Sequence, residues 1–279
     1  MAVSIDEILA QPLSCIRTYL LSRDGPVPMA WIDALECDPR RGAKKMAGLL
    51  RKRRLEDCRE THRLNRLLKF ERTLWAQGVC FIAGIDEAGM APLAGPVVAA
   101  AVILPPEYKL PGLNDSKKIT DAHRREALAV QIKQDAVCYA AARAEVEEID
   151  KLNIYHAGIL AMRRAVQGLS TKPGYMLVDA RTIPDCECPQ KGIIRGDAVS
   201  ASIAAASIIA KTTRDAHMIE MGNKYPAYGF ELHKGYPTRM HLRALKEYGA
   251  LPIHRRSFAP VRAVLGIEPS QGELFRNSQ

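Results

Sequence analysis

The spacing of apolar residues changes once along the chain, near residue 78. Before this point apolar residues are scattered among many charges, which predicts a helical N-terminal extension over 1–75 with a break near "CDPRRG" (37–42). After it come two apolar runs, "GVCFIAGID" (78–86) and "GPVVAAAVIL" (95–104). A Gly/Pro loop, "EAGMAPLAG", lies between them, and this spacing predicts a hairpin-like antiparallel strand pair.

Strands and helices then alternate. We expect a helix over 121–134 with Thr120 as its cap, a strand over 136–146, and a second helix over 147–169. Further strands are predicted over 174–180 and 191–197, followed by a helix over 200–221. This order predicts an α/β domain with a mixed sheet over 76–265. The polar residues 266–279 are expected to form a short disordered tail.

Three predicted strands end in an acid: Asp86, Asp179 and Asp197, with Glu87 beside the first. Groups at strand ends of open α/β sheets face a common crevice, so we expect these carboxylates to converge. Converging carboxylates repel one another unless protons or cations compensate, and Mg²⁺ prefers oxygen ligands. A pair of such ions can promote phosphodiester cleavage, so the pattern favours a metal-dependent nuclease over four separate turn caps.

Positive charge is concentrated in one segment. The chain carries a formal net charge of +9, and residues 40–72 hold 13 Lys/Arg against 4 Asp/Glu, which accounts for the whole excess. Clustered Lys and Arg on a helix either form a solvated face or bind nucleic-acid phosphates, and charge alone leaves both interpretations open.

Other features limit the location of the protein. No apolar run approaches the length of a membrane span, and the first residues lack the pattern of a secretory signal. The seven cysteines are scattered, with Cys186 and Cys188 as the only close pair. We therefore expect reduced thiols in a cytoplasmic, monomeric protein with no membrane partner.

Several long motifs resemble those of one family. The motifs "GIDEAGMAPLAGPVVAAAVIL", "LNDSKKIT", "LVDA", "GDAVSASIAAASIIAKTTRD", "YPAYGFELHKGYPT" and "HRRSF" occur in the order found in ribonuclease HII, the bacterial type 2 ribonuclease H. The resemblance spans 81–265 and implies a ribonuclease H-like fold. It also implies Mg²⁺- or Mn²⁺-dependent cleavage of the RNA strand of RNA–DNA hybrids, and of duplex DNA at embedded ribonucleotides. The products would carry 3′-hydroxyl and 5′-phosphate ends.

The resemblance places the four catalytic, metal-binding acids at Asp86, Glu87, Asp179 and Asp197. Successive residues of a regular strand point to opposite faces, so Asp86 and Glu87 cannot both face the site from one. We therefore expect Asp86 to bridge two metals, and Glu87 to reach the site as the first residue of the following loop.

Substrate contacts are implied at three further positions. Tyr236 of "HKGY" resembles the family tyrosine that stacks on a sugar, and Lys117 and Lys118 of "DSKK" resemble phosphate contacts. His233, His241 and His254 are expected to be structural, because nothing places a nucleophile beside them.

One departure separates the chain from the family pattern. Where the family has Gly-Arg-Gly, a substrate-binding tripeptide, the chain has Gly89-Met90-Ala91. Met90 removes a guanidinium, and Ala91 adds a Cβ where close approach or a positive φ could be required. The rival hypothesis is therefore a hybrid-binding protein with weakened junction cleavage. An integrase or resolvase is disfavoured by "HKGYPT" and "DSKK".

The tail contains one short motif. "QGELF", Gln271–Phe275, resembles the Q-x-x-L-F peptide by which bacterial replication proteins bind the sliding clamp. Three fixed positions are a weak signal, so an idle tail is the alternative.

Overall fold

A computed structural model describes residues 5–22 and 25–268. The chain divides into two compact units, 1–65 and 66–279. No helix in the described ranges combines the length and apolar character needed to cross a membrane. The tail motif at 271–275 lies outside the described residues.

The first unit is helical, as predicted. Its helices are α1 (Ile5–Leu9), α2 (Leu13–Ser22), α3 (Met29–Cys37) and the greater part of α4 (Arg41–Leu67). Ile16, Ile32 and Ala43 belong to its buried apolar core. The predicted break is confirmed, because α3 ends at Cys37 and α4 begins at Arg41. Between them Asp38 accepts hydrogen bonds from the backbone N–H and side chain of Arg40.

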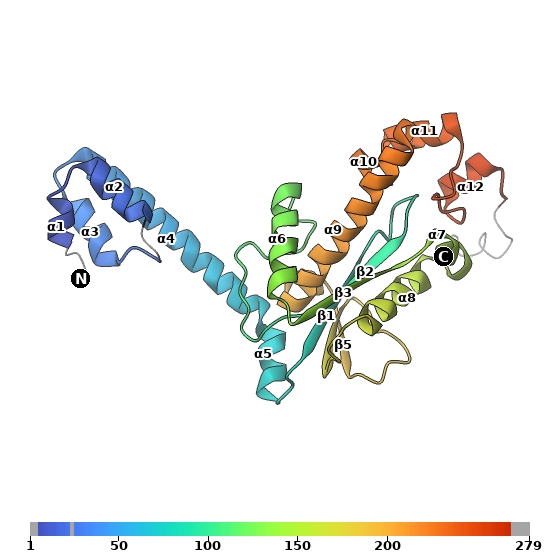
Figure 1. Ribbon diagram of the computed structural model, residues 1–279, viewed down its shortest axis with the longest axis horizontal. Helices are drawn as coiled ribbons and strands as arrows, with labels where there is room; N and C mark the ends of the chain where they lie inside the picture. Colours follow the sequence, from blue (N-terminus) through green and yellow to red (C-terminus); the bar gives the residue numbers. More distant parts are fainter. Residues whose placement is uncertain (1–4, 23–24, 269–279) are drawn as a thin grey trace, which may run out of the picture. The chain divides into compact units, whose positions relative to one another are not determined.

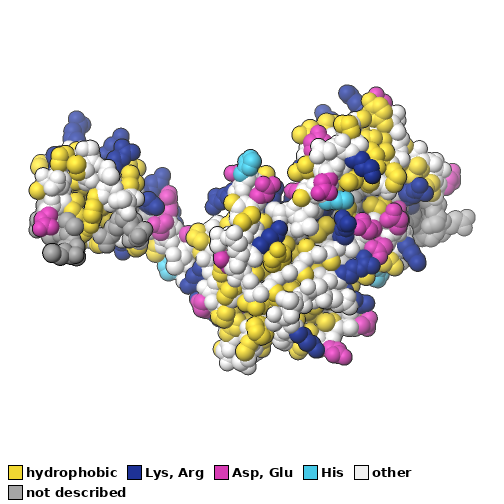
Figure 2. All heavy atoms as spheres, viewed as in Figure 1, with side chains coloured by type: hydrophobic (Ala, Val, Ile, Leu, Met, Phe, Trp, Pro, Cys, Tyr) yellow, Lys and Arg dark blue, Asp and Glu magenta, His cyan; other side chains and the backbone are white. Residues whose placement is uncertain are grey.

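Exposed positive charge follows one face of α4. Arg41, Lys45, Lys52 and Arg59 are separated by four or seven residues, so they lie on the same side of the helix, and all four are exposed. Side chains of Lys and Arg are visible on this unit in Figure 2. We call these four residues the α4 basic stripe.

A five-stranded mixed sheet forms the centre of the second unit (Figure 1). The strands are β1 (Ile82–Ala88), β2 (Val97–Ile103), β3 (Cys138–Ala144), β4 (Tyr175–Asp179) and β5 (Gln190–Ile193), in the order β3-β2-β1-β4-β5. β2 pairs antiparallel with both β1 and β3, while β4 is parallel to β1 and to β5. The predicted hairpin and mixed sheet are therefore confirmed.

Helices cover both faces of this sheet (Figure 1). On one face α8 (Ile154–Gln167) packs Ala157, Ala161 and Met162 into a core shared with alternate residues of β1 and β2. On the other face lies α9 (Ala201–Lys224). Its close approach requires Gly84, because a Cβ there would lie 2.0 Å from the Ser202 carbonyl carbon. Covering both faces explains why every residue of β2 is buried.

Two predictions of helix ends were wrong. The helix expected over 147–169 is two helices, α7 (Val146–Leu152) and α8, because Asn153 adopts φ +67° and caps α8 through its side chain. The cap of α6 (Ala122–Asp135) is Asp121 rather than Thr120, since the Asp121 carboxylate accepts the His123 N–H.

The remaining helices frame the sheet. These are α5 (Lys69–Ala76), α10 (Phe230–His233), α11 (Arg239–Tyr248) and α12 (Ala259–Leu265), with 3₁₀ turns η1 (Gly196–Ala198) and η2 (Pro226–Tyr228). α5 belongs to the second unit: buried Glu71 accepts hydrogen bonds from the Ser200 hydroxyl and the Ser202 N–H at the start of α9. The division between the two compact units falls after Asn65.

Candidate functional site

Asp86 and Glu87 lie side by side within β1, opposite Ala100 and Ala99 of β2. Asp86 is 3% exposed and lies near Ser207 of α9, which lowers the pKa of Asp86 against the larger effect of burial. Its Oδ1 also accepts the N–H of Glu87 at 2.7 Å. Asp86 therefore faces α9 and strand alternation turns Glu87 toward the opposite face, yet the two carboxylates stay close enough for the Glu87 charge to raise the pKa of Asp86.

The prediction that Glu87 begins a loop was wrong. β1 continues to Ala88, because its pairing with β2 extends through Ala88 and Val98. From this strand position Glu87 contacts Arg181, whose Nη2 lies 3.4 Å from Glu87 Oε1.

Asp179 is the last residue of β4, as predicted. Immediately after it Ala180 adopts φ +54°, a left-handed conformation that is costly for a non-glycine residue and turns the chain sharply. The Asp179 Oδ1 accepts the N–H of Gly196 at 2.7 Å. Asp179 thereby holds the turn that carries the fourth acid.

Asp197 lies in the 3₁₀ turn η1 and is 5% exposed. The prediction that it ends a strand was wrong, because β5 ends at Ile193. Arg195, at φ +56°, changes the chain direction before the turn. Ser200 then caps α9, so η1 joins the sheet to that helix.

Burial and mutual repulsion raise the pKa values of three of these acids. Burial, followed by the charges of Glu87 and Asp179, raises the pKa of Asp86 well above its ordinary value. Burial and Asp179 likewise raise the pKa of Glu87 against the opposing effect of Arg181. For Asp197, burial together with Asp115 and Asp179 raises the pKa to about 6. The site therefore favours protons or bound cations.

Lys117 is the second cation beside the acids. Its Nζ lies 3.9 Å from Asp197 Oδ2. Although most of its side chain is exposed, partial desolvation opposes its charge, but nearby carboxylates, first Asp86 and then Asp197, outweigh this effect and raise its pKa. Ser116 fixes the loop by a 2.8 Å hydrogen bond between its hydroxyl and that of Ser207. Lys118 is exposed and, among the described residues, forms no ion pair with these acids.

Sequence reasoning missed three members of this cluster: Asp115, Arg181 and Ser207. Asp115 and Ser207 lie within quoted motifs, but nothing in the pattern distinguished them from ordinary polar residues. The position of Arg181 depends on the turn at Ala180, which the sequence pattern does not indicate.

The tripeptide Gly89-Met90-Ala91 is held by a buried arginine. Arg255 is fully buried and donates from its guanidinium to the carbonyls of Gly89, Met90 and Gly95 at 2.6, 3.1 and 2.9 Å. Gly89 adopts φ +95°, whereas Ala91 is exposed and is not among the described residues with positive φ. The Cβ of Ala91 therefore imposes no backbone strain there.

A second buried arginine, Arg214 of α9, fixes the other end of this loop. It donates to three carbonyls, those of Ala94, Pro96 and Lys234, at 3.0–3.1 Å. Both guanidiniums thus satisfy carbonyls of irregular backbone, which would otherwise be buried without partners. The loop beside the acids is consequently held at both ends by buried guanidiniums.

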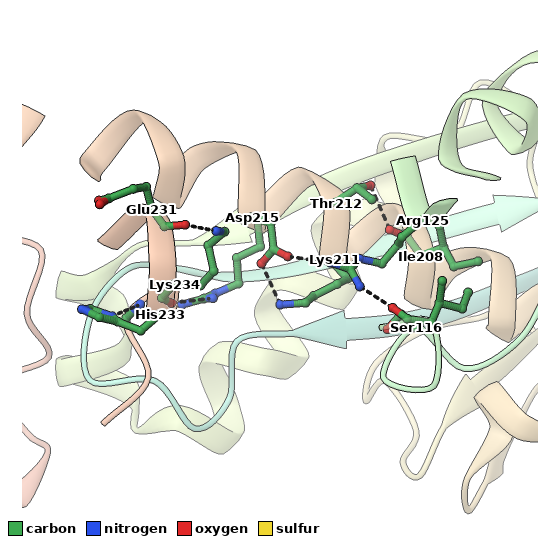
Figure 3. A network of polar contacts seen from close by, with 12 residues as sticks. Ser116, Arg125, Ile208, Lys211, Thr212, Asp215, Glu231, His233 and Lys234 are labelled. Atoms are coloured by element: carbon green, nitrogen blue, oxygen red, sulfur yellow. Dashed lines mark hydrogen bonds and ion pairs between the residues drawn. The ribbon is translucent and has the colours of Figure 1, made fainter. Parts of the chain in front are cut away.

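Tyr236 is 39% exposed, and the Nζ of Lys211 lies 5.9 Å from its ring centroid. Lys211 is itself fixed by Asp215, which also pairs with Arg125 (Figure 3). An exposed aromatic ring on such a support is suited to stacking on a planar or sugar surface.

The backbone of Tyr236 rests on buried histidines. Nδ1 of His241 lies 2.9 Å from the Tyr236 carbonyl and must donate to it, so its Nε2 accepts from Nε2 of His254 at 3.0 Å. Nδ1 of His254 then accepts the N–H of Leu251. Burial lowers both pKa values, that of His254 to about 4, which fits neutral rings in the structural role expected of them.

Carboxylate oxygens are the ligands that hard divalent cations prefer. One of them, the buried Glu87 Oε2, has no hydrogen-bond partner in the described part of the chain. Within 5–22 and 25–268, however, no three His, Cys, Asp or Glu side chains are arranged to hold one ion. Lys117 and Arg181 lie against the acids in this arrangement. The donor set therefore fits a metal, while its coordination geometry is not assembled.

Comparison with known proteins gives matches that cover the residues of this site. A family model described as "Ribonuclease HII" matches residues 83–261, a range that includes the four acids, Lys117 and Tyr236. Ribonuclease HII of Myxococcus xanthus (strain DK1622) is 58% identical over 280 residues, which cover 98% of this chain and 96% of that protein. The similarity thus includes the N-terminal unit.

Solved structures support the fold. Ribonuclease H2 from Pyrococcus horikoshii OT3 superposes with a TM-score of 0.57 at 26% identity, covering 71% of this chain and 100% of that one. Ribonuclease HII from Archaeoglobus fulgidus, solved as a complex with PCNA, gives a TM-score of 0.55 at 26% identity, covering 64% and 95%.

From the raised pKa of Asp197 we predict how the stability of the folded state changes with pH. A carboxyl with a raised folded-state pKa favours the folded state at low pH, and this contribution is lost as pH rises from its ordinary value of 3.8 through about 6. In EDTA, Asp197→Asn should therefore raise the melting temperature at pH 7.5 by a few degrees, corresponding to roughly 1 kcal/mol. The gain should shrink at pH 4.

Differential scanning calorimetry at both pH values would measure this effect. Asp121→Asn is the matched control, because asparagine caps a helix as well as aspartate does. A lower melting temperature for Asp197→Asn at pH 7.5, or an equal gain at both pH values, would contradict the repulsion between the acids.

Proposed function

The chain belongs to the ribonuclease HII family, and on this premise we propose that Asp86, Glu87, Asp179 and Asp197 are its active-site carboxylates. As a type 2 ribonuclease H it is an endonuclease that acts on RNA–DNA hybrids, and the family is divalent-metal dependent. The observation that carries the site assignment is the proximity of acids from β1, β4 and η1: burial first, and then neighbouring acids, raise the pKa values of Asp86, Glu87 and Asp197.

The acids would hold two divalent cations, Mg²⁺ or Mn²⁺, which supply an activated water and neutralise charge on the departing oxygen. Asp86 is suited to a central position, since Glu87 and Asp179 both raise its pKa. Glu87 offers an unpartnered buried oxygen. The Glu87 N–H orients the Asp86 carboxylate, and the Gly196 N–H orients that of Asp179.

Two further side chains would bind the nucleic acid. Lys117 projects from its loop with most of its side chain exposed, and it lies beside the acids, where it can meet a phosphate. Tyr236 presents an exposed ring supported by Lys211, suited to stacking on the sugar beside the scissile phosphate. Through these contacts we propose that the enzyme also cuts duplex DNA at embedded ribonucleotides, leaving 3′-hydroxyl and 5′-phosphate ends.

Asp86→Asn should reduce cleavage by more than about a hundredfold, because a neutral amide cannot replace a carboxylate between two cations. Initial rates at saturating Mg²⁺ on a long hybrid and on a duplex with one ribonucleotide would test this, with Asp121→Asn as control. Near-normal turnover by the folded variant would contradict the assignment. Wild-type cleavage of the hybrid but not of the single-ribonucleotide duplex would favour the rival hypothesis of weakened junction cleavage.

The α4 basic stripe is proposed as an additional phosphate-binding surface. Its residues are exposed and share one helix face, which suits non-specific contact with a nucleic-acid backbone. Lys45→Gln with Arg59→Gln should weaken hybrid binding a few-fold and lower the slope of log K against log[salt] by about one to two.

Arg51→Gln with Arg53→Gln is the matched control for the stripe. It removes the same charge from other faces of α4, and Arg51 is already paired with Asp33. Equal effects of the two double variants in salt-dependent anisotropy would show that the stripe is only a solvated face.

We also propose that Gln271–Phe275 binds a sliding clamp. Support comes from the Q-x-x-L-F pattern and from the PCNA complex of the Archaeoglobus fulgidus relative. Titration of peptide 266–279 against the clamp of the same organism should give a micromolar Kd that is lost on Leu274→Ala with Phe275→Ala. Absence of binding, or binding unaffected by the substitutions, would eliminate this partner.

A further inference from the structure

Arg181 occupies a position that the catalytic assignment leaves unexplained. It follows Asp179 by two residues, and the left-handed Ala180 turns it back so that its N–H lies 2.7 Å from the Asp179 carbonyl. Its side chain is only 17% exposed. The strained turn therefore directs a long cationic side chain toward the acids rather than into solvent.

Two contacts hold the guanidinium. One is Glu87, with a 3.4 Å separation between Nη2 and Oε1. The other is Tyr155 at the start of α8, whose ring centroid lies 5.0 Å from the guanidinium carbon and whose side chain is half exposed. The planar cation thus lies on an aromatic surface at the edge of the site.

The pairing with Glu87 leaves both partners incompletely satisfied. Within the described part of the chain, Arg181 Nη1 and Glu87 Oε2 are buried and have no hydrogen-bond partner. A structural pair in the same unit looks different: Arg164 donates to both oxygens of Glu148 at 2.7 and 2.8 Å. A buried donor without an acceptor costs about 1–3 kcal/mol. A purely structural arginine would not leave its Nη1 unpartnered at this cost, so we expect Nη1 to bind an acceptor from outside the chain.

Arg181 also lies beside Met90, an uncharged residue of the loop after β1. A Cβ added to Gly158 of α8 would lie 3.2 Å from Arg181 Nη1 and 3.2 Å from Met90 Sδ. The side chains of Arg181 and Met90 therefore both lie next to Gly158. Met90 packs against the core there, so residue 90 offers no charge at this edge, whereas Arg181 does.

We propose that Arg181 is a substrate-binding residue whose guanidinium binds a phosphodiester oxygen of the nucleic acid and supplies the positive charge that Met90 does not offer at this edge. The inference rests on the proposed active site. A guanidinium fork matches phosphate geometry, and stacking on Tyr155 orients it. Binding a phosphate would give the unpartnered Nη1 an acceptor and would move Arg181 away from Glu87. The Glu87 carboxylate would then be available to bind a divalent cation.

Binding without cleavage tests this proposal. In EDTA, Arg181→Met should raise the Kd for a labelled RNA–DNA hybrid about five- to tenfold at low salt, and lower the slope of log K against log[salt] by about one. Arg181→Lys should recover only part of the affinity, because it restores the charge but not the fork. Arg164→Met, which removes the same charge from α8, should change Kd less than about twofold.

A second substitution tests whether the two positions serve the same phosphate. Met90→Arg should restore most of the affinity lost in Arg181→Met, while adding much less to the wild-type chain. Unchanged Kd and slope in Arg181→Met, or equal gains from Met90→Arg in both backgrounds, would overturn the proposal.

These readouts are independent of turnover. An active Asp86→Asn variant would refute the acid assignment and leave the binding result standing. An unaltered Kd for Arg181→Met would refute only the role of Arg181.

Discussion

Repulsion among buried carboxylates is the constraint on which the catalytic unit depends. Asp86 and Asp197 are almost completely buried, and nearby acids raise both pKa values. Uncompensated burial of such charge would cost several kcal/mol, so the surrounding chain supplies donors and cations. Lys117 reaches Asp197, and Arg181 reaches Glu87, each over a separation greater than 3 Å. These loose pairs lower the repulsion without closing the site to other cations.

Rigid elements around the acids keep them in place against this repulsion. Gly84 lets α9 approach β1, and α9 in return places Ser207 near Asp86, where it lowers the pKa of that carboxyl against the larger effect of burial. The same helix carries Arg214, which with Arg255 holds the loop after β1 through backbone carbonyls. The loop that contains Met90 and Ala91 therefore carries no charge of its own at these two positions but is held by both arginines.

Sequence patterns located the sheet and its acids because a buried apolar strand seldom ends in a carboxylate unless a cation or a donor meets it. They failed where a single residue decides the path of the backbone. Asn153 divides a continuous helical pattern by adopting positive φ, and Arg195 redirects the chain so that Asp197 lies in a 3₁₀ turn. Glu87 stays in β1 because its partner strand continues, which only the register shows. The position of Arg181 was not predicted either, because it depends on the positive φ of Ala180, and no sequence pattern indicates that turn.

The central claim is that these acids hold divalent cations, and counting bound ions tests it most directly. Mn²⁺ binding followed by electron paramagnetic resonance, in the presence of an RNA–DNA hybrid, would give stoichiometry independently of turnover. We expect two ions per chain in the wild type, a loss of at least one in Asp86→Asn, and no loss in Asp121→Asn. Equal Mn²⁺ occupancy in the wild type and Asp86→Asn would contradict the claim.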